Sequence, residues 1–245
     1  MYPQSVNEFL LCKIRAIGAR ARRLSSLSPA SVGLRGEDEP YAPTYGHFRS
    51  ANLRLQKIDA DIVQRLRYLR KKWQRGTPED ALVFIALVEK EIDRARRAFG
   101  LFFDVFSQRC SGFGPVLSAH DAIARDCYNV VGRTVPNIFK KKMLKPITYL
   151  DHGYSPATMR REVSLKRLLG ERNPFPLIRI PWDRDNPWQA VFLHEIGHNL
   201  HADLGIWQEN RKAVKNRMLF FTGDMRLSKI YERWHKEIFA DLIAV

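Results

Sequence analysis

Residues 190–205, AVFLHEIGHNLHADLG, place two histidines four positions apart, with a glutamate directly after the first. If this stretch is helical, His194 and His198 lie on one face with their Cβ atoms about 5–6 Å apart. Two imidazoles at that separation can bind one metal ion at roughly 2.0–2.1 Å per nitrogen. Glu195 projects about 100° round the helix, which keeps it off that ion but lets it reach a water held there. The pattern therefore predicts zinc bound by His194 and His198, with Glu195 as general base.

The sequence around the motif favours a helix. Asp185 or Asn186 can cap its first turn, and Pro187 suits its first helical position. From there to Asp203, only Gly197 is a helix breaker, and a glycine lets another element approach the metal face closely. The alternative interpretation is a polar cluster on a surface helix.

A catalytic zinc of this kind needs a third protein ligand and an open fourth position. In a helix expected at about residues 226–245, Glu237 and Asp241 are four apart, at the edge of the apolar sector. A carboxylate placed toward a core is unfavourable unless it is paired or bound to a cation. Metal binding would satisfy Glu237, and accepting the Nδ1–H of a ligating histidine would satisfy Asp241. The alternative is two ordinary acids on the shoulder of a helix, paired with Arg226 or Arg233.

Other residues near the motif are expected to stay outside the metal site. His201 lies one further turn along the motif helix, too far to bind the same ion, although it can line the cleft. Glu232 falls on the opposite, basic side of the last helix. By helical angle, Tyr231 and His235 point away from Glu237.

HEIGH, followed in the last helix by EIFAD, resembles the gluzincin clan of zinc metallopeptidases, with their thermolysin-like HExxH…ExxxD arrangement. The match covers residues 186–245. The resemblance implies zinc ligands at His194, His198 and Glu237, a base at Glu195, and a supporting carboxylate at Asp241.

The same resemblance extends to a strand and to the reaction. FPLIRIP is similar to the edge strand that, in this clan, precedes the active-site helix and pairs with an extended substrate. Zinc would lower the pKa of a bound water toward 7, and Glu195 would carry its proton to the leaving nitrogen. We therefore expect a zinc-dependent endopeptidase acting on polypeptides. Candidates for the residue that stabilises the oxyanion are His201, His152 and Tyr154.

The first part of the chain is expected to be helical. Apolar residues in residues 51–73 recur every three or four positions, as in one stripe of an amphipathic helix. A second helix begins with Thr77 as cap and Pro78 at its first position. The short connection RGTP predicts an antiparallel helical hairpin at about residues 51–107. The first stripe consists of Leu55, Ile58, Ile62, Leu66, Leu69 and Trp73.

Farther along, the segments KPITYLDHGYSP and FPLIRIPW are short, bounded by proline and rich in branched residues, which is typical of strands. Residues 25–50 are expected to form a loop. Further helices are expected at about residues 118–132, 155–170, 187–203, 207–221 and 226–245.

We therefore predict an α+β fold that is predominantly helical. A basic helical region spans residues 1–145. A zincin-like metallopeptidase domain, with a small β-sheet and an HExxH active-site helix, spans residues 146–245.

The chain carries 41 Lys and Arg against 26 Asp and Glu, a formal net charge of +15. Such a surface favours an anionic partner: nucleic acid, acidic protein or a membrane surface. One alternative is a basic surface without a dedicated partner. Another is a basic nucleic-acid-binding or regulatory protein with a non-hydrolytic zinc site, although such a site has no use for a glutamate base.

Three cysteines without a CxxC pair argue against a disulfide framework and for a reducing compartment. No apolar run approaches the roughly 18 residues of a transmembrane helix. The N-terminal segment is Arg- and Ser-rich and poor in acids, so it faintly resembles an organelle transit peptide, but a basic amphipathic helix fits it better. We therefore expect a cytoplasmic protein without a transmembrane segment.

Overall fold

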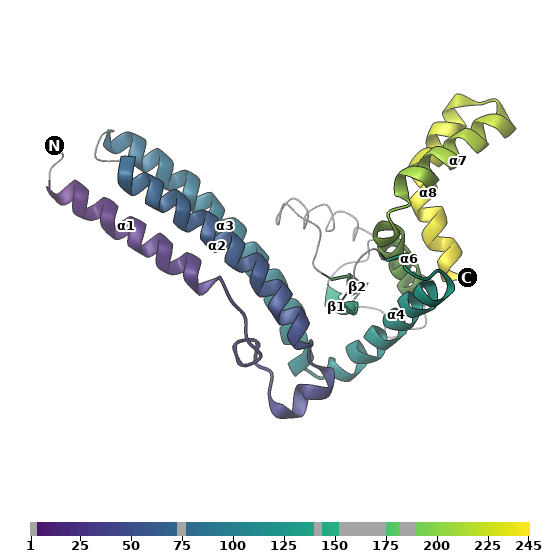
Figure 1. Cartoon of the computed structure of the whole chain (residues 1–245), viewed down its shortest axis with the longest axis horizontal. Coiled ribbons are helices and arrows are strands. Elements are labelled where there is room, and N and C mark those ends of the chain that lie inside the picture. The colour runs from purple at the N-terminus through teal and green to yellow at the C-terminus, as the bar shows by residue number, and fades with distance from the viewer. Residues whose placement is uncertain (1–3, 73–76, 140–143, 152–174, 182–189) are drawn as a thin grey trace. The chain divides into compact units, whose positions relative to one another are not determined.

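The computed structural model describes residues 4–72, 77–139, 144–151, 175–181 and 190–245. These residues are predominantly helical with one two-stranded sheet, as the sequence predicted (Figure 1). The helix expected at about 155–170 lies outside the described residues, as do His152, Tyr154 and Trp73. None of the described helices combines the length and the apolar composition of a membrane span.

Among the described residues, the chain forms two compact units, one ending at residue 112 and the other beginning at residue 113. This division near residue 112 differs from the boundary predicted at residue 145. The difference is α4, Gly114–Thr134, whose apolar face packs on the sheet and helix of the second unit.

The first unit consists of three long helices, α1 (Gln4–Arg23), α2 (Tyr45–Lys72) and α3 (Pro78–Ser107), which pack side by side (Figure 1). The predicted stripe of α2 is buried at Leu55, Ile58, Ile62, Leu66 and Leu69. Short 3-10 helices follow α1 and α3, at Ala30–Val32, Gly36–Tyr41 and Gln108–Cys110.

Local hydrogen bonds define the two ends of the predicted hairpin. The Thr77 hydroxyl accepts the backbone N–H of Asp80, whose carboxylate accepts the Thr77 N–H, so the predicted cap forms a capping box. At the other end, the loop predicted through residue 50 was wrong, because α2 already begins at Tyr45. The Thr44 hydroxyl lies 2.8 Å from His47 Nδ1, and the Phe48 ring packs 4.7 Å from that of Phe106.

The second unit begins with α4 and two strands. β1 (Ile147–Asp151) and β2 (Leu177–Pro181) lie in the segments predicted as strands, and they pair in parallel with Ile147 opposite Leu177. Helix α4 starts at Gly114 rather than Ser118, because Pro115 fits its first turn. Asp121 of α4 holds β1 through the Thr148 N–H, which it accepts at 2.7 Å.

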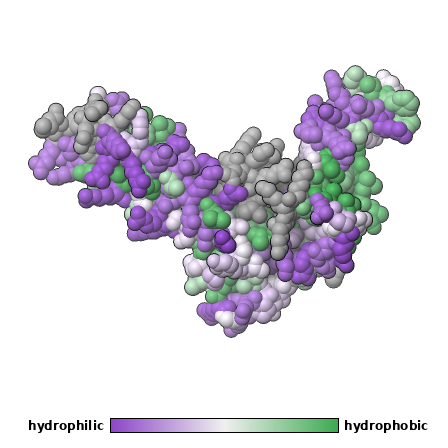
Figure 2. Space-filling view, viewed as in Figure 1, coloured by the Kyte–Doolittle hydropathy of each residue, from purple (hydrophilic) through white to green (hydrophobic). Residues whose placement is uncertain are grey.

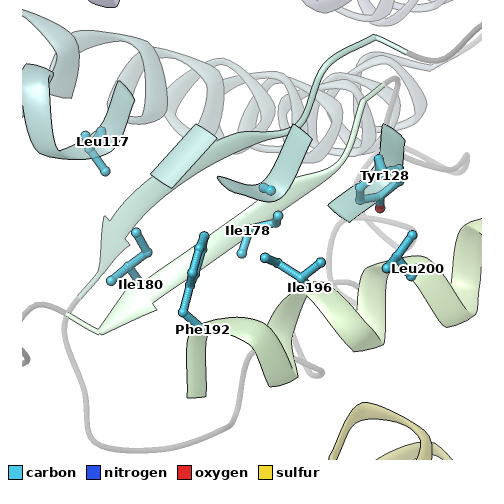
Figure 3. Close-up of a cluster of buried hydrophobic side chains, with 8 residues drawn as sticks. Leu117, Tyr128, Ile178, Ile180, Phe192, Ile196 and Leu200 are labelled. Atoms are coloured by element: carbon cyan, nitrogen blue, oxygen red, sulfur yellow. The ribbon is translucent and has the colours of Figure 1, made fainter. Parts of the chain in front are cut away.

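Three helices complete this unit: α6 (Ala190–Leu204), α7 (Trp207–Thr222) and α8 (Met225–Ala244). Within the described residues they match the three predicted helices to within a few residues. Helix α6 lies across the sheet, and its apolar side chains point toward those of β2 and α4 (Figure 3). The Tyr128 hydroxyl of α4 donates to Asp203 Oδ2 near the end of α6 at 2.7 Å. The buried cluster comprises Leu117, Ala124, Tyr128, Ile178, Ile180, Phe192, Ile196 and Leu200.

Candidate metal centre

Helices α6 and α8 pack very closely at one point. A Cβ atom added to Gly197 would lie 2.8 Å from Ala240 Cα and 3.1 Å from its carbonyl oxygen. Ala240 is completely buried at this contact. The close approach predicted for Gly197 is therefore made by α8, because only a hydrogen atom fits between the two backbones.

This contact brings together the two motif histidines and the predicted third ligand. The Oε2 atom of Glu237 lies 3.4 Å from His194 Nε2 and 3.1 Å from His198 Nε2. The three donor atoms all lie within 4.8 Å of one another. A tetrahedral ion with ligand bonds of about 2.0–2.1 Å would hold neighbouring ligand atoms about 3.3–3.4 Å apart. The two distances from Glu237 Oε2 therefore fit an ion of zinc's size.

Asp241 contacts His194 at the ring nitrogen that does not face Glu237. His194 Nδ1 lies 2.7 Å from Asp241 Oδ1. Because a carboxylate only accepts, Nδ1 carries the proton of this contact, and in the neutral ring the lone pair is then on Nε2, the nitrogen that faces Glu237. A carboxylate in this position orients a ligating imidazole and raises its basicity.

Burial favours the neutral form of the second histidine. His198 is buried, and this burial lowers its pKa below the ordinary value, against the opposing attraction of Glu237. Because only a neutral imidazole can donate its lone pair to a metal, the lowered pKa extends the pH range over which His198 can bind one. Two neutral nitrogens and one carboxylate oxygen form a donor set that suits zinc.

Glu195, the predicted base, lies on the turn between the two histidines. Its side chain is buried in the second unit, and its backbone carbonyl accepts the Asn199 side-chain amide at 3.1 Å. Its helical position is about 100° from His194 and about 60° from His198. It therefore flanks the metal face without being one of the three converging donors.

Glu232 lies outside this cluster, as predicted. It accepts Arg211 Nε at 2.9 Å and lies 3.5 Å from Lys215 Nζ, so it links α8 to α7. His201 is also outside, as predicted, but it does not lie in an open cleft: it is completely buried. Its ring stacks 4.4 Å from that of Phe239 and lies 5.5 Å from that of His235.

This packing has an electrostatic consequence. Burial, with smaller contributions from His235 and His198, lowers the pKa of His201 to about 4. Asn210 Nδ2 lies 3.1 Å from His201 Nε2, so α6, α7 and α8 all contribute to the surroundings of this ring. His201 and His235 therefore help to hold the helices that carry the converging donors.

The sequence did not predict two residues that contact the metal-ligand candidates or their helix. Ala240 is the partner of Gly197, and its signal was a small residue between the two acids of α8. Lys236 Nζ lies 3.4 Å from Glu237 Oε1, the oxygen that faces away from the histidines. This contact orients the carboxylate, and the adjacent position of Lys236 in the sequence was its only signal.

In comparisons with models of known protein families, with curated proteins and with solved structures, the chain matches none of them.

Proposed function

We propose that the chain is a zinc-dependent endopeptidase of the gluzincin type. The observation that carries the proposal is the convergence of His194 Nε2 and His198 Nε2 on one oxygen of Glu237, at 3.4 and 3.1 Å. Asp241 behind His194 supports it, because a histidine held in this way is a typical metal ligand.

Each residue of the cluster has a distinct role in the proposal. His194, His198 and Glu237 bind the ion, and Asp241 holds the Nδ1 proton of His194. Bound zinc supplies an acidified water and polarises the substrate carbonyl. Glu195 removes the proton of the attacking water and then transfers it to the leaving nitrogen, so the carboxylate ends each cycle deprotonated.

Strand β2 suggests how a polypeptide would bind. It pairs with β1 along one edge, and among the described residues no strand occupies its other edge. An extended substrate can add to a strand edge through backbone hydrogen bonds. Because α6 packs directly on β2, a peptide bound along that edge would pass close to the helix that carries the motif.

The decisive experiment compares the wild type with Glu195→Gln in parallel. Both proteins should bind one equivalent of zinc, because Glu195 is not a ligand. The variant should cleave a mixture of unstructured polypeptides about 10²–10⁴-fold more slowly, since its amide cannot accept the proton. Zinc content is measured by elemental analysis, and cleavage by mass spectrometry of the products.

Two results would point elsewhere. A zinc-loaded wild type without peptidase activity, but with salt-dependent binding to DNA or RNA, would favour a basic nucleic-acid-binding protein with a non-hydrolytic site. Full activity in zinc-loaded Glu195→Gln would remove this residue from the mechanism.

A further inference from the structure

The far end of the α7–α8 hairpin exposes a group of apolar side chains. Phe220 and Phe221 close α7, and Met225 opens α8; they are 81%, 65% and 50% exposed. The two phenyl rings contact each other, with centroids 5.4 Å apart. Figure 2 shows hydrophobic residues gathered at this end, with hydrophilic residues along the flanks.

This group does not contribute to the core of its unit. No residue of α7 is buried, and Gly223, in the left-handed conformation with a φ of 64°, turns the chain sharply between the helices. A single exposed apolar residue is ordinary, but neighbouring ones at a projecting turn mark an interaction surface.

Basic residues surround the apolar group. The Arg217 guanidinium lies 4.7 Å from the centroid of the Phe221 ring, and Arg226 and Lys229 lie within the first turns of α8. Among the described residues, these three form no ion pair with a carboxylate. The one acid at the turn, Asp224, accepts the backbone N–H groups of Arg226 and Leu227 as the cap of α8.

We propose that this hairpin end, Phe220, Phe221 and Met225 with Arg217, Arg226 and Lys229, docks the protein on an anionic phospholipid surface. The apolar side chains would enter the interfacial region, where aromatic rings are favoured. The three cations would remain at the level of the phosphates, with their apolar stems along the acyl boundary. An aliphatic Met beside the rings favours lipid over nucleic acid bases, which stack on aromatic faces.

The proposal goes beyond peptide hydrolysis and does not depend on it. Helix α8 carries both the docking surface and Glu237, twelve residues apart in sequence, so the metal centre would lie about 18 Å along the helix from the lipid. Substrates reached in this arrangement would be segments close to a membrane surface.

The first test measures binding of the full chain to vesicles by co-sedimentation. The wild type should bind vesicles of equal parts phosphatidylcholine and phosphatidylglycerol at least about tenfold more tightly than phosphatidylcholine alone. The double variant Phe220→Ser/Phe221→Ser should lose about tenfold or more of the binding to anionic vesicles. Tyr45→Ser is the matched control, because Tyr45 is an aromatic residue of the first unit with the same exposure, 81%.

The second test detects insertion at the site itself. The tryptophan fluorescence that Phe220→Trp adds to that of the wild type is obtained by subtraction. This added emission should shift to the blue on anionic vesicles and should be quenched by brominated lipid. Tyr45→Trp should show neither effect. Because all three positions are exposed, circular dichroism should show unchanged helix content in every variant.

Three results would overturn the proposal. The first is binding to anionic vesicles that the double serine variant leaves unchanged, which would assign adsorption to the rest of the basic surface. The second is an added tryptophan emission in Phe220→Trp that lipid does not alter. The third is an absence of binding to anionic vesicles. Self-association that the double variant abolishes would then make the surface a contact between copies of the chain.

Discussion

The helices of the two units differ in how their charged and ionisable side chains are arranged. In the first, α1, α2 and α3 bury apolar stripes against one another, and their charged residues form exposed pairs such as Arg20 of α1 with Glu89 of α3, 3.3 Å apart. Exposed pairs of this kind contribute only about 0–1 kcal/mol. In the second, α6 and α8 meet at Gly197 and Ala240 and bring imidazoles and carboxylates together. In the second unit the close approach of the two backbones brings ionisable side chains together, whereas in the first unit they stay in exposed pairs.

The largest expected effect is a difference in zinc affinity between variants of two glutamates of α8. Glu237→Ala should weaken zinc binding by more than about 100-fold, because it removes a direct ligand, whereas loss of a supporting residue costs about 10- to 100-fold. Glu232→Gln, which alters only a partly buried contact with Arg211 and Lys215, should leave the affinity unchanged. Competition titration against a chelator measures both. Equal zinc affinity in the two variants would mean that the third ligand lies elsewhere.

The helix crossing can be tested with a pair of glycines, one in each unit. Gly197→Ala should destabilise the second unit by on the order of 2 to 3 kcal/mol, because its Cβ would meet the α8 backbone at 2.8 Å. Gly100→Ala in α3 has nothing within 4 Å of the added Cβ, so it should stabilise the first unit by about 0.5–1 kcal/mol.

Thermal unfolding followed by circular dichroism measures both glycine variants, and zinc titration adds a second readout. Gly197→Ala should also weaken zinc binding, since Glu237 moves with α8. A variant as stable as the wild type with normal zinc affinity would show that the close contact does not position the site.

The second unit should also respond to acid through His201. Because burial lowers its pKa to about 4, the unfolded chain, whose histidines titrate near 6.5, binds this proton more tightly. The stability conferred by neutral His201 is therefore complete above pH 6.5 and is lost as pH falls toward 4. The expected loss between pH 7.5 and 5 is about 2 kcal/mol.

Chemical denaturation at the two pH values measures this loss. His201→Gln keeps an oxygen that can accept the Asn210 amide and does not titrate in this range. The variant should therefore lack the loss of stability that comes from protonating His201. If the variant loses as much stability as the wild type, the acid sensitivity arises from other groups.

The smallest effect concerns Asp241. Its side chain is largely exposed, so Asp241→Ala should weaken zinc binding only about tenfold, at the low end of what supporting carboxylates contribute. Asp241→Asn keeps an oxygen that can accept the His194 Nδ1–H and should lose less. The same chelator titration measures both, and an alanine variant with wild-type affinity would show that His194 needs no such partner.

Much of the helical framework could be predicted because its causes are local. The apolar stripe of α2, the Thr77 cap and the helical stretch around HEIGH depend on residues a few positions apart. Where α2 begins could not be predicted, because its first turn rests partly on Phe48 packing against Phe106, far away in the sequence. The place of α4 in the second unit likewise depends on a distant contact between Tyr128 and Asp203.

For the site, the sequence by itself determined that His194 and His198 share a face, because helical periodicity fixes the angle between residues four apart. It also placed Glu237 and Asp241 together on another helix. Only the tertiary structure decided that the two faces meet, because their distance depends on the Gly197–Ala240 contact, and nothing local to either helix specifies that packing. The same holds for His201: its sequence position suggested a cleft, and packing against Phe239 and His235 buried it.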